Sequence, residues 1–123
     1  MLGLFVLQRK EVNHTNDKNE AIETMIDYIY EHVSEPALFL QLAEEAAELS
    51  HAAMKMVRFI NGDCPSGLTK EGISNHIAEE MGDVMNCIDV ITKGSYIPAS
   101  EVLDSGEKKM IRWVNRINEK KQD

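Results

Sequence analysis

The sequence has few of the residues that build disulfide frameworks, and it has no long hydrophobic run. Cys64 and Cys87 are the only cysteines among 123 residues, and their spacing fits neither a disulfide scaffold nor a C-x-x-C motif. We therefore expect free thiols in a reducing compartment. The apolar residues 1–7 have no basic segment before them and reach Arg9 and Lys10 too soon for a signal peptide or a membrane span. We expect a cytoplasmic protein that does not bind membranes.

Basic residues are scarce relative to acidic ones. The chain has 13 Lys and Arg against 21 Asp and Glu, for a net charge of −8, which disfavours binding to nucleic-acid polymers or anionic membranes by the chain as a whole. A polyanionic substrate would need local cations or a bound metal ion. The 43% hydrophobic content is ordinary for a soluble domain. Because a chain this short buries only a modest core, we also expect self-association.

Turn-forming residues divide the chain into segments with a helical pattern. The polar residues 13–19 separate an N-terminal arm, 1–18, from a helical domain, 19–123. Within that domain apolar residues recur at spacings of three and four, which predicts amphipathic helices. The predicted helices cover approximately residues 20–33, 36–60, 69–93 and 98–120. Ser105-Gly106 is a candidate break in the last helix. No alternating strand pattern is present, so the sequence predicts an all-α, four-helix-bundle-like fold.

The second predicted helix carries acidic residues where apolar ones are expected. At about 100° per residue, Glu45 lies within the apolar stripe that includes Leu42 and Leu49. Glu48 lies at the edge of this stripe, whereas Glu44 points toward solvent. Glutamates on helices are usually solvated, so a position on the apolar face is informative.

The third predicted helix repeats the arrangement. Glu80 aligns with Ile77 and Val84, Asp83 flanks it at i+3, and Glu79 points outward. A buried ionised carboxylate is unfavourable unless it is paired, and no Lys or Arg interrupts either stripe. A hard cation held by carboxylate oxygens relieves this penalty. Mg²⁺ is the usual ion in phosphate chemistry, and Mn²⁺ accepts similar ligands.

The pattern Glu45-x-x-Glu48, followed after a loop by Glu80-x-x-Asp83, resembles the signature of MazG-like nucleoside triphosphate pyrophosphohydrolases. The similarity covers approximately residues 20–120. It implies an all-α MazG-type domain in which these four acids bind Mg²⁺. It also implies hydrolysis of a nucleoside triphosphate, canonical or noncanonical, to a monophosphate and pyrophosphate, and a homodimer or homotetramer. Which acid takes the proton of the attacking water stays open.

The resemblance extends to candidate substrate-binding residues. Lys109 and Arg112 match the basic part of the family's last helix, where cations meet the substrate phosphates, and Asn86 matches an asparagine that can contact the nucleotide. A solvated basic face near a helix end and an ordinary polar position are the alternative interpretations. His76 departs from the family pattern, because relatives often carry a basic residue at this position.

Trp113 is the only tryptophan of the chain and lies at helical spacing from Met110 and Ile117. Aromatic residues in such a pattern more often pack in a core than form a platform for a nucleobase. We therefore expect Trp113 to be buried.

Two other functions compete with the enzyme. Glu48-x-x-His51 matches half of a carboxylate-bridged di-iron site, but Glu80-x-x-Asp83 stands where a second Glu-x-x-His is required. Ligation by oxygen alone favours Mg²⁺ or Mn²⁺ over iron redox chemistry. The other alternative is a non-catalytic helical interaction module, whose buried acids would meet basic residues of a partner protein. Dependence on metal distinguishes the enzyme from this module.

Overall fold

The computed structural model describes residues 16–64, 66–94 and 96–122. The helices in this part of the chain are α2 (Asn16–His32), α3 (Glu35–Ile60), α4 (Lys70–Ile91) and α5 (Ala99–Gln122). The described residues contain no strand, which confirms the all-α prediction. None of these helices has the length and hydrophobicity that a membrane span requires. Residues 1–15 of the predicted arm lie outside the described residues, and residues 16–18 belong to α2, which begins earlier than predicted.

The predicted starts of α3 and α4 are confirmed, and each is fixed by a side chain that caps the helix. The hydroxyl of Ser34 accepts a hydrogen bond from the backbone N–H of Ala37 at 3.4 Å. Thr69 accepts one from the N–H of Gly72 at 3.0 Å. These bonds satisfy N–H groups that have no partner within the first turn of a helix.

The end of α3 is set by a glycine in the left-handed region. Gly62 has φ of 78°, and its N–H donates to the carbonyl of Phe59 at 3.1 Å. The N–H of Asp63 donates to the carbonyl of Arg58 at 2.8 Å. Together these bonds form a Schellman motif, which satisfies the last carbonyls of a helix and turns the chain away.

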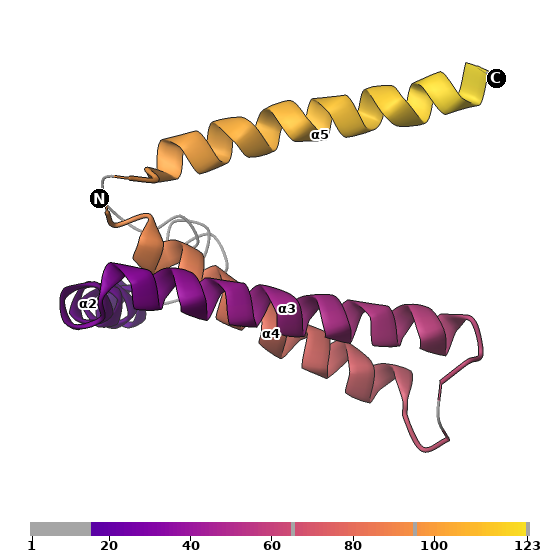
Figure 1. The fold of residues 1–123 in the computed structure, drawn as a ribbon, viewed down its shortest axis with the longest axis horizontal. Helices are drawn as coiled ribbons and strands as arrows, with labels where there is room; N and C mark the ends of the chain where they lie inside the picture. The colour runs from indigo at the N-terminus through magenta and orange to yellow at the C-terminus, as the bar shows by residue number, and fades with distance from the viewer. Residues whose placement is uncertain (1–15, 65, 95, 123) are drawn as a thin grey trace.

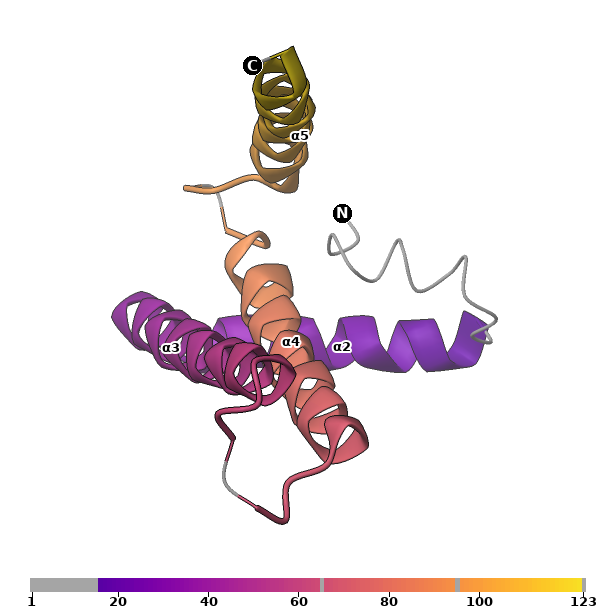
Figure 2. The same ribbon diagram turned by 90° about the vertical axis from the view of Figure 1, so that its right-hand side faces the viewer.

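Helices α3 and α4 lie side by side as an antiparallel pair, and α2 runs across them (Figures 1 and 2). The core lies where these three helices meet. Its buried residues are Ile26, Leu38, Val90 and Ile91, with Ile22, Leu42 and Ile97 partly buried against them. Because α2 is placed by this core, it lies close to the α3–α4 pair at the end where α4 finishes.

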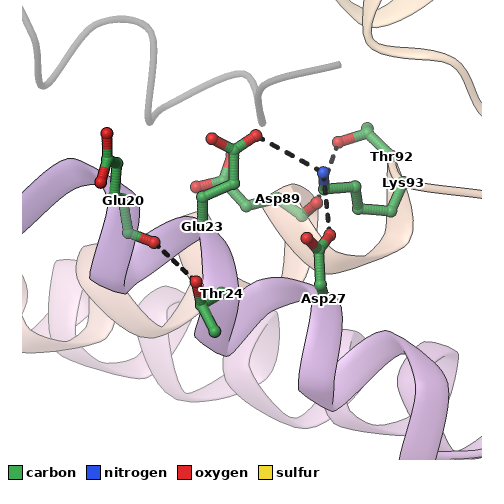
Figure 3. Close-up of polar contacts among 7 residues, drawn as sticks. All are labelled: Glu20, Glu23, Thr24, Asp27, Asp89, Thr92 and Lys93. Carbon is green, nitrogen blue, oxygen red and sulfur yellow. Dashed lines mark hydrogen bonds and ion pairs between the residues drawn. The ribbon is translucent and has the colours of Figure 1, made fainter.

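A polar cluster also ties α2 to the end of α4 (Figure 3). The ammonium of Lys93 lies 2.9 Å from Oδ1 of Asp27 and 3.6 Å from Oε1 of Glu23, both on α2. Thr92 donates to the backbone carbonyl of Asp89 at 3.3 Å, and Asp89 is fully buried. Burial alone would lower the pKa of Lys93, but the hydrogen bond and the attraction of Asp27 and Glu23 outweigh it and raise this pKa. The cluster therefore holds a charged lysine between the two helices.

Helix α5 stands apart from the other described helices and runs in roughly the same direction as α3 (Figures 1 and 2). It is continuous through Ser105 and Gly106, so the candidate break at this pair is wrong. Trp113 is 59% exposed, so its predicted burial is also wrong for a single chain, because no other described helix covers this face of α5. Three helices pack together within one chain, and the four-helix-bundle-like arrangement stays a prediction.

Candidate metal centre

Three carboxylates from two helices converge between α3 and α4. Glu45, Glu48 and Glu80 each offer an oxygen, and these atoms lie within 4.8 Å of one another. Glu45 and Glu48 are one turn apart on α3, so both can approach the neighbouring α4. Glu80 is only 7% exposed, Glu45 is half-buried and Glu48 is exposed. The structure therefore brings three of the four predicted acids close together, and only one of these three, Glu80, is buried.

Two of the carboxylates have an oxygen without a hydrogen-bond partner. These atoms are Oε2 of Glu45 and Oε2 of Glu80, and both are buried. The other oxygen of Glu45 accepts a hydrogen bond from the side-chain amide of Gln41 at 2.5 Å. Buried polar atoms in proteins are rarely left without a partner, and a bound cation, a water molecule or a proton on either carboxyl group would satisfy these oxygens.

The electrostatics of Glu80 are unfavourable for an ionised side chain. Burial raises the pKa of its carboxyl group above the ordinary value of 4.5, and the charge of Glu48 raises it further. His76 acts in the opposite direction, with Nε2 3.7 Å from Oε1 of Glu80. A hydrogen bond with Glu48 and the charge of Asp83 again raise this pKa. In the described part of the chain no Lys or Arg forms an ion pair with these carboxylates, so a cation would relieve their repulsion.

Asp83 lies outside the group of three converging acids. It is exposed on α4, and its charge is felt by both Glu80 and Cys87. It also lines the same pocket as Glu45. Asp83 is therefore next to the predicted site, at the side where α4 continues toward the core.

This pocket opens beside the acids and has a volume of about 190 Å³. Its polar lining is formed by Gln41, Glu45, Asp83, Asn86 and Cys87, and its apolar lining by Ile29, Leu38 and Val90. Asn86, a predicted substrate-binding residue, therefore shares a cavity with two of the predicted acids. A ligand in this pocket would meet carboxylates, side-chain amides and apolar side chains.

Two polar residues that line this pocket, Gln41 and Cys87, are not among the predicted site residues. Gln41 precedes Glu45 by four, and Cys87 follows Asp83 by four, so helical spacing could have identified both. Burial raises the pKa of the Cys87 thiol, and the charges of Glu45 and Asp83 raise it further. Cys87 therefore stays protonated at neutral pH and is unsuited to act as a nucleophile.

Lys109 and Arg112 are not brought together with the acids in a single chain. Both are exposed on α5, which stands away from the α3–α4 pair (Figures 1 and 2). His51, half of the di-iron motif, is exposed on α3 and lies outside the converging group. The described acidic group thus offers only oxygen ligands.

The donor set fits a hard divalent cation. Carboxylate oxygens are preferred ligands of Mg²⁺ and Mn²⁺, and two of the oxygens here are buried without a hydrogen-bond partner. Comparison with known proteins assigns neither a family nor a function to the chain, because no protein-family model, curated protein or solved structure matches it.

Proposed function

We propose that the protein is a cytoplasmic, Mg²⁺-dependent pyrophosphohydrolase that converts a nucleoside triphosphate to a monophosphate and pyrophosphate. The observation that carries this proposal is the convergence of Glu45, Glu48 and Glu80 around buried oxygens that lack a hydrogen-bond partner. Asp83 and Asn86 line a pocket directly beside them. A metal-binding acidic group next to a ligand-sized cavity suits the handling of a phosphate chain.

Glu45, Glu48, Glu80 and Asp83 would hold the ion, with Mn²⁺ as an alternative to Mg²⁺. When bound, the ion would screen the phosphate oxygens and make water a better nucleophile. The water oxygen attacks phosphorus, the bond between the α and β phosphates breaks, and pyrophosphate leaves. Glu48 and Asp83 are exposed, and either can accept the proton that the attacking water loses.

Substrate binding would use the pocket and the basic residues of α5. Asn86 can donate a hydrogen bond to the nucleotide from the pocket wall, and Lys109 and Arg112 can bind phosphate oxygens. Because α5 stands apart from the acids, contact of these two cations with the same substrate requires another copy of the chain or a rearrangement of α5. A MazG-type bundle and a homodimer or homotetramer are part of the same proposal.

The proposal is tested with Glu80→Gln, which keeps the size of the side chain but removes one negative charge from the acidic group. Pyrophosphate release is screened over ribo- and deoxynucleoside triphosphates with Mg²⁺, and the melting temperature is measured with and without the ion. We expect Mg²⁺ to stabilise the wild type. In the variant this stabilisation should disappear and turnover should fall by about 100-fold or more, while the metal-free variant stays at least as stable as the wild type.

Glu79→Gln is the matched control, since it makes the same change one residue earlier on α4 at an exposed side chain outside the group. It should retain turnover and the response to Mg²⁺. Unchanged turnover in folded Glu80→Gln would remove Glu80 from the site. A wild type that neither releases pyrophosphate nor responds to Mg²⁺ would favour the non-catalytic interaction module.

A further inference from the structure

Gln41 contacts the acidic group from one turn earlier on α3. Its side-chain amide donates a hydrogen bond to Oε1 of Glu45 at 2.5 Å, and the spacing of four residues places both side chains on one face of the helix. An ionised carboxylate only accepts hydrogen bonds, so the nitrogen of the amide, and not its oxygen, faces Glu45. The bond therefore fixes the orientation of the amide and the position of one carboxylate oxygen.

This hydrogen bond makes the two oxygens of Glu45 different. Oε1 accepts the bond from Gln41, whereas Oε2 is buried and has no hydrogen-bond partner. A carboxylate that is held at one oxygen presents the other in a defined direction. Residues outside the ligand set of a metal ion commonly orient the ligands in this way.

Glu45 needs such a restraint when no cation is bound, because the converging carboxylates repel one another. Glu80 is 7% exposed, so its surroundings keep it in place. Glu45 is only half-buried, and rotation of its side chain toward solvent would relieve the repulsion. The hydrogen bond from Gln41 opposes that rotation and keeps Glu45 near Glu48 and Glu80.

We propose that Gln41 is a positioning residue, which holds Glu45 in place for the metal ion and leaves Oε2 of Glu45 as the oxygen that binds the ion. This inference rests on the metal site of the proposed function. Because the amide of Gln41 is neutral, it orients Glu45 without cancelling the negative charge that attracts a cation. A ligand that is already in position loses less conformational freedom when the ion binds, so the affinity is higher.

Gln41→Met tests the proposal, since it keeps the length of the side chain and removes the hydrogen-bond donor. Binding of Mn²⁺ alone to the full chain is measured by electron paramagnetic resonance, which records the free ion. We expect the dissociation constant of Mn²⁺ to rise by about 10- to 100-fold. The urea midpoint of the metal-free variant should equal that of the wild type, because Gln41 is exposed and water can replace its amide as a donor.

A purely structural role of Gln41 would give the opposite result, with a lower urea midpoint and an unchanged dissociation constant for the folded variant. Asn75→Leu is the matched control, because it removes an amide at an exposed position of α4 that does not line the pocket. It should keep the wild-type affinity for Mn²⁺. Gln41→Asn retains the amide but is one methylene too short to reach Glu45, so it should weaken Mn²⁺ binding as Gln41→Met does. Circular dichroism verifies that each variant keeps its helices.

A double-mutant cycle shows whether Gln41 acts through Glu45. Glu45→Ala removes the carboxylate that Gln41 orients and should itself weaken Mn²⁺ binding. Adding Gln41→Met to Glu45→Ala should then leave the dissociation constant unchanged, because the positioned group is gone. Fully additive effects would mean that Gln41 acts on the ion independently of Glu45, and they would overturn the proposal.

The remaining outcomes separate this inference from the proposed function. A wild type that binds no Mn²⁺ would overturn the metal site and the role of Gln41 together. A wild type that binds Mn²⁺ with an affinity that Gln41→Met leaves unchanged would overturn the role of Gln41 alone.

Discussion

Among single residues, Glu80 combines burial with the repulsion of neighbouring carboxylates. A glutamate with 7% of its surface exposed would ordinarily find a cationic partner or several hydrogen-bond donors. Here it has His76 at 3.7 Å, a hydrogen bond with the neighbouring acid Glu48 and one buried oxygen without a hydrogen-bond partner. Such a residue does little for the stability of the metal-free fold at neutral pH, which is why we interpret it functionally.

The raised pKa of Glu80 predicts how the stability of the metal-free protein depends on pH. Below pH 4.5 Glu80 is protonated in both the folded and the unfolded chain. The full contribution of the neutral side chain to the stability of the fold is then present. As the pH rises through the higher pKa of the folded state, that contribution is lost, because the folded protein resists ionisation. The unfolding free energy of the wild type minus that of Glu80→Gln should therefore decrease between pH 4.5 and neutrality.

Urea unfolding in the presence of a chelator measures this difference. Glu79→Gln makes the same change in charge at an exposed neighbour and should follow the wild-type profile. A constant difference between wild type and Glu80→Gln over this range would contradict the assignment of a raised pKa to Glu80.

The partly buried position of Lys93 predicts how much its substitution would lower the unfolding free energy. Its side chain is 15% exposed and pairs with Asp27 and Glu23 on α2. Lys93→Met leaves these acids facing each other without the cation, so we expect a loss of about 1–3 kcal/mol of unfolding free energy. Chemical denaturation measures the loss.

Lys108→Met is the matched control for Lys93→Met. Lys108 lies 3.0 Å from Asp104, but its side chain is 72% exposed, and exposed pairs contribute about 0–1 kcal/mol. Equal effects of the two substitutions would show that the ion pairs between α2 and α4 do not stabilise the fold.

At the scale of elements, the end of α3 depends on one backbone conformation. Gly62 has φ of 78°, which costs other residues about 1–2 kcal/mol, and nothing within 4 Å would contact an added Cβ. We expect Gly62→Ala to destabilise the protein by about that amount through strain alone. Gly82→Ala, inside α4 and equally free of close contacts, should stabilise it by about 0.5–1 kcal/mol.

Thermal or urea unfolding of the two alanine variants checks the prediction by its sign. If Gly62→Ala were neutral, the loop after α3 would accept another turn geometry, and the Schellman motif would not determine where α3 ends. Opposite signs for the two substitutions would show that backbone conformation, and not side-chain volume, distinguishes these positions.

At the scale of the whole molecule, charge and hydrophobic surface are unevenly distributed. The carboxylates gather between α3 and α4, while exposed apolar side chains and most of the basic residues of the described chain lie on α5, which stands apart from them (Figure 1). Under the proposed function, a bound cation would reduce the repulsion between the carboxylates. A second copy of the chain would cover the exposed apolar side chains of α5. Both would stabilise the folded state by mass action, so the melting temperature should depend on Mg²⁺ and on protein concentration separately.

The sequence by itself determined the helices and the faces on which the acids lie. Helical spacing, the caps at Ser34 and Thr69 and the turn at Gly62 act over a few residues, so they can be recognised without knowledge of the fold. The same local periodicity placed Glu45 and Glu80 on the inward sides of their helices.

Only the tertiary structure decided how these elements meet. Glu48 joins Glu80 while Asp83 stays outside the group, and Ile29 of α2 reaches the pocket beside them. Trp113 is exposed because α5 leaves the other helices. These outcomes depend on the distance and crossing of helices that are remote in the sequence, and periodicity within one helix contains no information about either.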